Sequence, residues 1–314
     1  MRKSTVFAAL AAALGVGGAA VACGSRTGLD ALNEATPDGG EAAEPEADGA
    51  LPLLDARPRI DAPVSMFCAD ASDTLVYTIT SSRTLLRFDP SSATFTRIGL
   101  INCPDDRSPF SMAVDRRGVA YVLYALANDT TPGTIFRVSL ETASCAATSF
   151  DGSNLAFDSF GMGFSADTDG GETLYIASDD MTNGRLGAVN PNTFALRLVG
   201  AFNPPVTEAE LTGTGDGRLY AFYAPGGVGT AGAAIAEIDK ATAAVLGQSS
   251  IPSVTVANGW AFAFWGGSFY MFTAPSGASS LVQRYDPSTK STTTVASYPE
   301  TIVGAGVSTC APVK

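Results

Sequence analysis

From residue 66 onward the chain alternates short apolar runs with clusters of Gly, Pro, Asn, Asp and Ser, a pattern typical of β-strands joined by turns. Two motifs recur within this region. The first is a strand that carries a tyrosine, at Tyr77, Tyr121, Tyr175, Tyr220 and Tyr270. The second is a strand that runs into a tight turn, at Asp89, Ser139, Asn190, Asp239 and Asp286. The turns are 50, 51, 49 and 47 residues apart, which indicates five copies of one supersecondary unit.

Each copy supplies four strands. A Gly- and Ala-rich strand precedes the tyrosine strand in four copies ("FSMAVD", "FGMGFSAD", "ELTGTGD" and "WAFAFWGG"), and a further strand follows the turn. The first copy lacks this strand before Tyr77, and "IVGAGVSTC" at 302–310 supplies it from the other end of the chain. We therefore predict an all-β, five-bladed β-propeller over 66–314, with four-stranded blades and a ring closed by a C-terminal strand. The alternatives are an irregular β-sandwich or an open array, but the terminal strand favours closure, because a closed ring leaves no exposed edge.

We name the strands of a blade A to D. The Gly- and Ala-rich strand A fits the narrow axis, strand B carries the tyrosine, and strands C and D lie outward. Because the tyrosine recurs once per blade, we interpret it as a packing residue rather than a catalytic one. The aromatic cluster of Trp260, Phe262, Phe264 and Trp265 on one A strand is interpreted in the same way.

The chain has five cysteines, so at least one lacks a partner within it. Cys68 precedes the first B strand and Cys310 follows the closing A strand, so ring closure makes them neighbours and predicts a disulfide. Cys103 and Cys145 then pair by elimination, although they lie nominally at opposite ends of a blade. Cys23 remains as the odd cysteine.

The N-terminus has the features of a secretory signal. Arg2 and Lys3 precede an apolar, small-residue run at 5–22, which ends in Ala20-Val21-Ala22 directly before Cys23. This stretch resembles the lipobox of bacterial lipoproteins, with Ala20 where Leu is preferred. We predict that 1–22 is a lipoprotein signal peptide and that Cys23 becomes the lipid-modified first residue. The alternative is an ordinary signal-peptidase cut after Ala22 that leaves Cys23 free.

Residues 23–65 form a polar segment rich in Pro, Ala, Asp and Glu, without hydrophobic periodicity. Between residues 24 and 64 it carries nine acidic and three basic residues. Such a segment buries too little apolar area to offset its ordering entropy, so we predict a disordered acidic linker.

Charge and composition exclude several function classes. The net charge of -12 repels nucleic acids and anionic lipid surfaces, so we expect no nucleic-acid partner and membrane contact only through a lipid at Cys23. The chain contains no histidine, which removes Ser-His-Asp and Cys-His nucleophile systems and His-ligated metals. We expect no cofactor, and any chemistry would depend on carboxylates, Tyr, Lys or Arg.

Several stretches together, "CGSRTGL", "SPFSMAVD", "FGMGFSADTDGGETLYIAS", "AELTGTGDGRLYAFY", "AFAFWGG" and "VGAGVSTCAP", resemble a family of secreted lipoproteins of unknown function that is abundant in myxobacteria and similar soil bacteria. The resemblance covers nearly the whole chain after the signal. It implies a cell-envelope location and a propeller fold, and it supplies no activity.

Propellers bind ligands at the axial mouth that their D–A and B–C loops form. The candidate lining residues here are Asp158, Phe160, Glu208, Glu210, Asn258 and Trp260. An outer ring of candidates consists of Asp179, Asp180, Arg185 and Tyr223. Carboxylates mixed with aromatic side chains suit the binding of a carbohydrate or a peptide.

Two sharper interpretations concern the acids. Asp158, Glu208 and Glu210 could supply the paired carboxylates of a glycoside hydrolase, or they could be solvated loop acids. Asp167, Asp169 and Glu172 place carboxylate oxygens at alternating sequence positions, as the ligands of a calcium loop are placed. That segment falls at an A–B connection, however, where other copies have plain turns, so turn chemistry is favoured over a metal.

The leading hypothesis is a non-catalytic binding or scaffold propeller of the cell envelope. It would be an outer-membrane lipoprotein, facing the periplasm or the surface, or a secreted protein, and would bind a glycan, a peptide or another envelope protein. The rival hypothesis is a carboxylate-dependent glycoside hydrolase.

Overall fold

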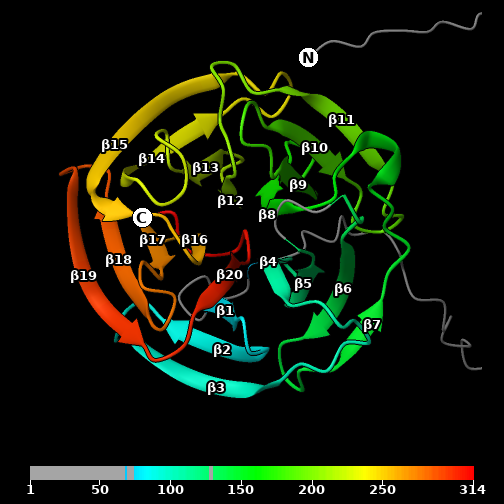
Figure 1. The fold of residues 1–314 in the computed structure, drawn as a ribbon, viewed down its shortest axis with the longest axis horizontal. Helices are drawn as coiled ribbons and strands as arrows, with labels where there is room; N and C mark the ends of the chain where they lie inside the picture. The colour runs from blue at the N-terminus through cyan, green and yellow to red at the C-terminus, as the bar shows by residue number, and fades with distance from the viewer. Residues whose placement is uncertain (1–67, 69–73, 127–129) are drawn as a thin grey trace, which may run out of the picture. The chain divides into compact units, whose positions relative to one another are not determined.

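The computed structural model describes residue 68 and residues 74–126 and 130–314 of the chain. These residues form five antiparallel four-stranded sheets that stand around a common axis, one sheet per blade (Figure 1). The predicted five-bladed propeller with four-stranded blades is therefore confirmed. The predicted signal peptide at 1–22, the linker at 23–65 and the lipidated Cys23 lie outside the described residues.

The strands are given by blade in the order A to D. Blade 1 consists of β20 (Ile302–Val307), β1 (Val76–Thr80), β2 (Thr84–Asp89) and β3 (Thr94–Leu100). Blade 2 consists of β4 (Pro109–Val114), β5 (Val119–Tyr124), β6 (Thr134–Ser139) and β7 (Cys145–Ala147). Blade 3 consists of β8 (Phe160–Ala166), β9 (Glu172–Ser178), β10 (Arg185–Val189) and β11 (Leu196–Ala201). Blade 4 consists of β12 (Glu210–Gly213), β13 (Leu219–Tyr223), β14 (Ala231–Ile238) and β15 (Val245–Thr255). Blade 5 consists of β16 (Trp260–Trp265), β17 (Ser268–Thr273), β18 (Ser280–Asp286) and β19 (Ser291–Tyr298).

Blade 1 closes the ring. Strand β20 pairs antiparallel with β1, with Val307 opposite Val76, although the two strands lie at opposite ends of the sequence. In the other four blades a short turn joins strand A to strand B. In blade 1 the Cys68–Cys310 disulfide takes the place of that turn, with 4.8 Å between the Cα atoms. The ends of the ring are thus held by both a strand ladder and a covalent bond.

The second predicted disulfide, Cys103–Cys145, is also present, with Cα atoms 5.3 Å apart. It joins the loop before β4 to β7, the D strand of blade 2, which is only three residues long. Where β7 ends, Thr148 Oγ1 donates a hydrogen bond to the carbonyl of Ile135. The disulfide and this hydrogen bond cover the edge of β6 that a full-length D strand would pair.

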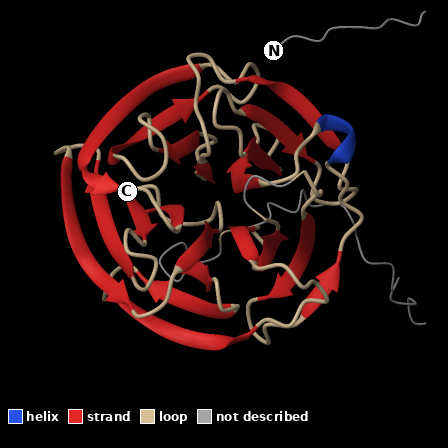
Figure 2. Cartoon of the chain, viewed as in Figure 1, coloured by secondary structure: helices blue, strands red, loops and turns tan. Residues whose placement is uncertain are grey.

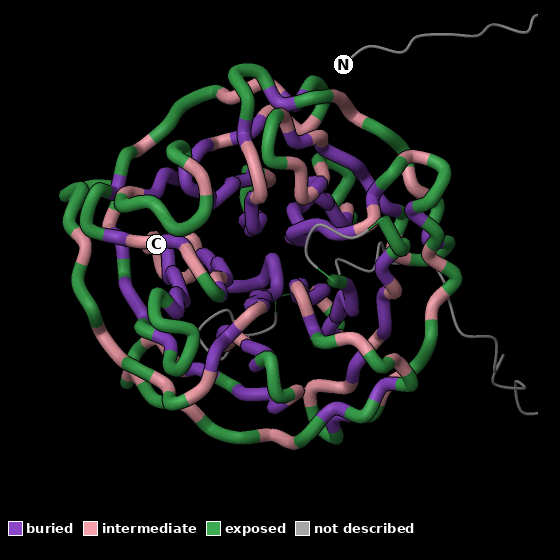
Figure 3. Tube along the Cα trace, in the orientation of Figure 1, coloured by how far each residue is buried: buried purple, intermediate pink, exposed green. Residues whose placement is uncertain are grey.

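The A strands contact one another around the axis, and small residues allow their close approach. A Cβ atom at Gly161 would lie 2.1 Å from the carbonyl oxygen of Ala209, and one at Gly213 would lie 2.2 Å from that of Phe164. Burial accordingly decreases from the A strands outward to the D strands (Figure 3). The Gly- and Ala-rich pattern of strand A is therefore a packing requirement.

The C–D turns repeat one construction. The residue that ends strand C or directly follows it accepts a hydrogen bond from the N–H two residues on, as Asp89 does from Ser91 and Asp239 from Ala241. The fourth residue after it adopts a positive φ without being glycine, at Ala93, Ala143, Phe194, Ala243 and Lys290. The predicted role of Asp and Asn in starting these turns fits this geometry.

The tyrosines of strand B are wholly or largely buried between blades, and burial raises the pKa of each phenol. Three of them lie directly opposite an arginine of strand C, in the pairs Tyr77–Arg87, Tyr121–Arg137 and Tyr270–Arg284. In blades 3 and 4 the opposite residues are Ala188 and Glu237. The burial of these rings fits the packing role expected from their recurrence.

Strands and loops make up nearly all of the described structure (Figure 2). The single helix among the described residues is the 3₁₀ turn η2 (Ser153–Leu155). No helix in this part of the chain is long and apolar enough to span a membrane.

Candidate functional site

The ring has two ends, and we name them by their connections. The mouth end carries the D–A loops at 101–108, 148–159, 202–209, 256–259 and 299–301. It also carries the B–C loops, described at 81–83, 125–126, 130–133, 179–184, 224–230 and 274–279. The hairpin end carries the A–B and C–D turns. All candidate binding residues predicted from the sequence lie in the loops of the mouth end or at the strand ends next to them.

Glu210, the first residue of β12, lies deep in the ring. Its side chain is buried, and Ser111 Oγ on β4 donates a 2.8 Å hydrogen bond to Glu210 Oε2. The backbone N–H of Met162 on β8 in turn donates to Ser111 Oγ, at 3.1 Å. Burial raises the pKa of Glu210 well above its ordinary value, against the opposing effect of the Ser111 hydrogen bond. The acid therefore links three A strands and favours its neutral form.

A hollow of about 210 Å³ lies at the mouth end of blade 3 and is lined by Asp158, Ser159, Asp179, Asp180 and Arg185. Ser159 Oγ donates to Asp179 Oδ2 at 2.9 Å. Asp180 accepts hydrogen bonds from the hydroxyl and the N–H of Thr182, which lower the pKa of its carboxyl. The structure thus brings one candidate lining residue, Asp158, together with three of the outer-ring candidates.

Arg185 holds one side of this hollow in shape. The guanidinium of Arg185 donates to the carbonyls of Leu155 and Ala156, at 2.9 and 2.7 Å, and lies over the ring of Phe157. Glu208 stands in the neighbouring loop with a positive φ of 45°, and burial followed by the charge of Asp179 raises the pKa of its carboxyl. Ser159 and Ser178 also line the hollow, and neither carried a signal in the sequence.

The remaining candidates are placed differently. Phe160 is fully buried against Phe150, and buried Tyr223 donates its hydroxyl to Gln248 on the outer strand β15, so both are core residues rather than lining residues. The reason is that each side chain follows the strand face that packs between blades. Asn258 is exposed and donates to a loop carbonyl. Trp260 is half-buried, and its indole N–H is buried without a hydrogen-bond partner in the described structure.

The calcium candidates lie at the hairpin end, where turn and interblade contacts occupy them. Asp167 Oδ2 accepts from the Thr173 hydroxyl at 2.8 Å, and Asp169 Oδ1 accepts from the Gly171 N–H at 2.9 Å. Glu172 accepts from the Arg116 N–H. Over residues 68, 74–126 and 130–314 no group of three or more Cys, Asp or Glu side chains is arranged to hold a metal ion.

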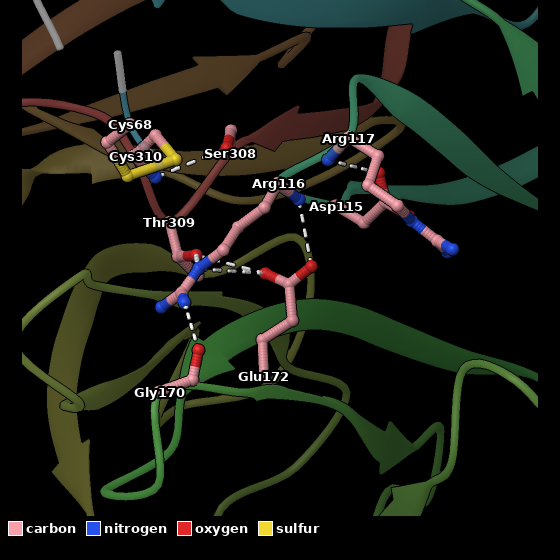
Figure 4. The surroundings of a disulfide bond; sticks show 9 residues. All are labelled: Cys68, Asp115, Arg116, Arg117, Gly170, Glu172, Ser308, Thr309 and Cys310. Carbon is pink, nitrogen blue, oxygen red and sulfur yellow. Dashed lines mark hydrogen bonds and ion pairs between the residues drawn. A yellow bond between two sulfur atoms is a disulfide. The ribbon is translucent and has the colours of Figure 1, made fainter. Parts of the chain in front are cut away.

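Beside the ring-closing disulfide, Arg116 and Glu172 form a network that the sequence did not reveal (Figure 4). Arg116 Nε donates to Thr309 Oγ1 at 2.7 Å, and Thr309 Oγ1 donates to Glu172 Oε2 at 2.9 Å. Arg116 Nη1 also donates to the carbonyl of Gly170. The network connects blades 2 and 3 to the segment that carries Cys310, so it has a structural role.

Comparison with known proteins yields no family. No protein-family profile and no curated protein matches the chain. Solved structures with similar folds include TolB from Acinetobacter baumannii (16% identity, TM-score 0.41, covering 72% of this chain and 53% of that one). The nidogen/laminin complex matches at 12% identity and TM-score 0.42, over 76% of this chain and 85% of that one. A glycosyl hydrolase from Bacteroides ovatus matches at 13% identity and TM-score 0.41, over 74% of this chain and 87% of that one.

This chain therefore spans about half the length of the TolB chain that it matches. Identities this low say nothing about activity, and the propeller assignment stands on the strand order itself.

Proposed function

We propose that the protein is a non-catalytic recognition or scaffold propeller of the cell envelope, and that its mouth end binds a glycan, a peptide or another envelope protein. The observation that carries this proposal is the position of Glu210. Its carboxyl is buried and hydrogen-bonded to Ser111, whereas Asp158 and Glu208 are only partly buried. A glycosidase needs two carboxyl groups that reach opposite sides of one sugar ring, and a sealed Glu210 is poorly suited to that task.

The proposed location rests on the cysteines. Two disulfides within the ring suit an oxidising compartment, which agrees with a secretory signal at 1–22. They leave Cys23 as the odd cysteine, and we propose that it carries a lipid and attaches the protein to the outer membrane. Replacement of Cys23 by Ser tests this step, because the protein should then leave the membrane fraction.

The binding role is tested with a glycan array and with capture of envelope proteins by the full chain. The double variant Asp158→Asn/Glu208→Gln should reduce binding at the mouth end by roughly tenfold, the usual scale for losing hydrogen bonds to charged groups. The matched control is Glu141→Gln, which removes an exposed acid from a C–D turn at the hairpin end. Equal loss in the control would contradict a mouth site.

The glycoside hydrolase remains the second candidate because of one observation. Burial keeps the pKa of Glu210 high, which is the property of a general acid. Product analysis of every glycan that binds separates the two functions. Turnover that Glu210→Gln abolishes would replace the binding proposal, and binding without turnover would retire the enzyme.

A further inference from the structure

A hollow of about 340 Å³ lies between blades 4 and 5 at the hairpin end, away from the mouth. We call it the lateral hollow and define it by its principal lining residues, Arg218, Tyr220, Glu237, Gln248, Phe269 and Tyr285. Its volume falls within the range of about 300–1,000 Å³ that is usual for small-molecule sites. The C-terminal segment forms part of its wall through Val313, and the Gly266 N–H donates to the carbonyl of Pro312 beside it.

Blade 4 departs from the repeat at this place. Glu237 lies opposite Tyr220, at the position where blades 1, 2 and 5 carry Arg87, Arg137 and Arg284. The cation over the Tyr220 ring is instead Arg218, from the A–B turn, with 5.6 Å between its guanidinium carbon and the ring centroid. Blade 3 also lacks the arginine, with Ala188 at this position and Lys240 over the Tyr175 ring, so the feature particular to blade 4 is an acid opposite the tyrosine.

The apolar side of the lateral hollow consists of packed aromatic rings. Tyr220 and Phe269 meet edge to face with centroids 4.8 Å apart, and Phe269 and Tyr285 are stacked at 6.5 Å. These side chains are 8%, 4% and 3% exposed, so their neighbours fix their positions. Burial and then the charge of Glu237 raise the pKa of Tyr220 to about 12, and the phenol keeps its proton at ordinary pH. The rings are therefore a rigid, uncharged wall.

The polar side of the lateral hollow offers both donors and acceptors. Glu237 accepts and Arg218 donates. The lining contains one cation and one anion, and Arg218 is also paired with Asp216 at 3.2 Å. By contrast, the hollow between blades 1 and 2 is lined by three arginines and one glutamate and has no phenylalanine.

An apolar wall that faces a donor, Arg218, and an acceptor, Glu237, matches a ligand with one apolar face and several hydroxyls. We propose that the lateral hollow is a binding site for a neutral saccharide unit, with Glu237 and Arg218 binding its hydroxyls and the aromatic wall contacting its apolar face. This inference rests on the proposed recognition role and not on the mouth as the place of binding.

The test uses the purified full chain on an array of neutral and acidic oligosaccharides, followed by calorimetric titration of the best neutral hit. Glu237→Gln keeps the shape and removes the charged acceptor, so affinity should fall roughly tenfold or more. Gly247→Phe should also block binding, because Gly247 lines the hollow and a Cβ there meets no atom within 4 Å. Glu141→Gln, which alters the hollow between blades 1 and 2, is the control and should bind normally.

Three outcomes overturn the inference. The first is the absence of any neutral hit, and the second is undiminished binding by both Glu237→Gln and Gly247→Phe. The third is that Asp158→Asn/Glu208→Gln loses binding while Glu237→Gln and Gly247→Phe keep it. That result would preserve the recognition role and place the binding site at the mouth. Thermal melts of each variant exclude unfolding as the cause of lost binding.

Discussion

The two ends of the ring use charge in opposite ways. At the hairpin end, basic side chains are paired with acids of the turns, as in Arg116–Glu172, Arg117–Asp115, Arg218–Asp216 and Lys240–Asp167. The described mouth loops carry many acids, namely Asp105, Asp106, Asp151, Asp158, Asp179, Asp180, Glu208 and Glu300. The basic residues of those loops are Arg83 and Arg107, and Arg107 is paired with Asp105 at 2.7 Å.

This difference separates structure from recognition. Arg116–Glu172 and Lys240–Asp167 connect turns of neighbouring blades, whereas Arg117–Asp115 and Arg218–Asp216 each lie within one turn. Excess acid at the mouth end does not stabilise the fold, because like charges repel. It gives that face a negative potential, which attracts the positively charged groups of a partner. Perturbing the hairpin end should therefore change stability, and perturbing the mouth should change binding.

Removal of the Cys68–Cys310 disulfide should have the largest effect. It closes a segment of 242 residues, for which the chain-entropy model gives about 5 kcal/mol, against about 4 kcal/mol for the 42-residue Cys103–Cys145 segment. Denaturant unfolding of Cys68→Ser/Cys310→Ser and of Cys103→Ser/Cys145→Ser measures both losses. A larger loss in the second variant would mean that blade 2, and not ring closure, limits stability.

Arg116→Met should come next, with a loss of about 2 kcal/mol. Only 14% of the Arg116 side chain is exposed, and its removal leaves the carboxylate of Glu172 buried without its cation. Arg218→Met is the control from another turn of the hairpin end. Arg218 and its partner Asp216 are both 46% exposed, so the loss should stay below about 1 kcal/mol. Equal losses in the two variants would show that burial does not govern these pairs.

The sequence predicted the fold because the evidence for it is periodic. Five tyrosine strands and five turns specify the blades, and the displaced A strand specifies closure. The pairing of Cys68 with Cys310 follows from that closure. Cys103–Cys145 was harder to predict, because nothing in the sequence shows that β7 stops after three residues and lets the loop before β4 reach it.

The candidate site was less predictable, because depth along the axis has no periodic signal. Glu210 and Asp158 look alike in the sequence, and only the position of Ser111 on a distant A strand shows that Glu210 is sealed. The exchange at Glu237 could have been found by aligning the five copies, since three of them carry arginine there. Its meaning depended on seeing Arg218 and the aromatic wall around it.

The smallest expected effect is a change in pH dependence that separates Glu210 from the exposed mouth acids. Burial raises its pKa in the folded chain above the ordinary value of 4.5, so between those two values the folded chain binds more protons than the unfolded chain. The free energy of unfolding should therefore fall as the pH rises from about 4.5 towards the folded pKa. Burial raises the pKa values of Glu172 and Glu208 in the same direction, so this variant isolates one of three such contributions among the described residues.

Glu210→Gln removes the titrating group and keeps an oxygen that can accept from Ser111. At pH 4 the variant and the parent should differ by no more than about 1 kcal/mol, because one neutral hydrogen-bonding group replaces another. Above pH 4.5 the variant should lose less stability per pH unit than the parent. Urea unfolding measured from pH 4 to pH 8 gives both slopes, with Asp151→Asn as the exposed control at the mouth. Parallel slopes would mean that water reaches the Glu210 carboxyl, and the mouth would then extend down the axis as a glycosidase cleft requires.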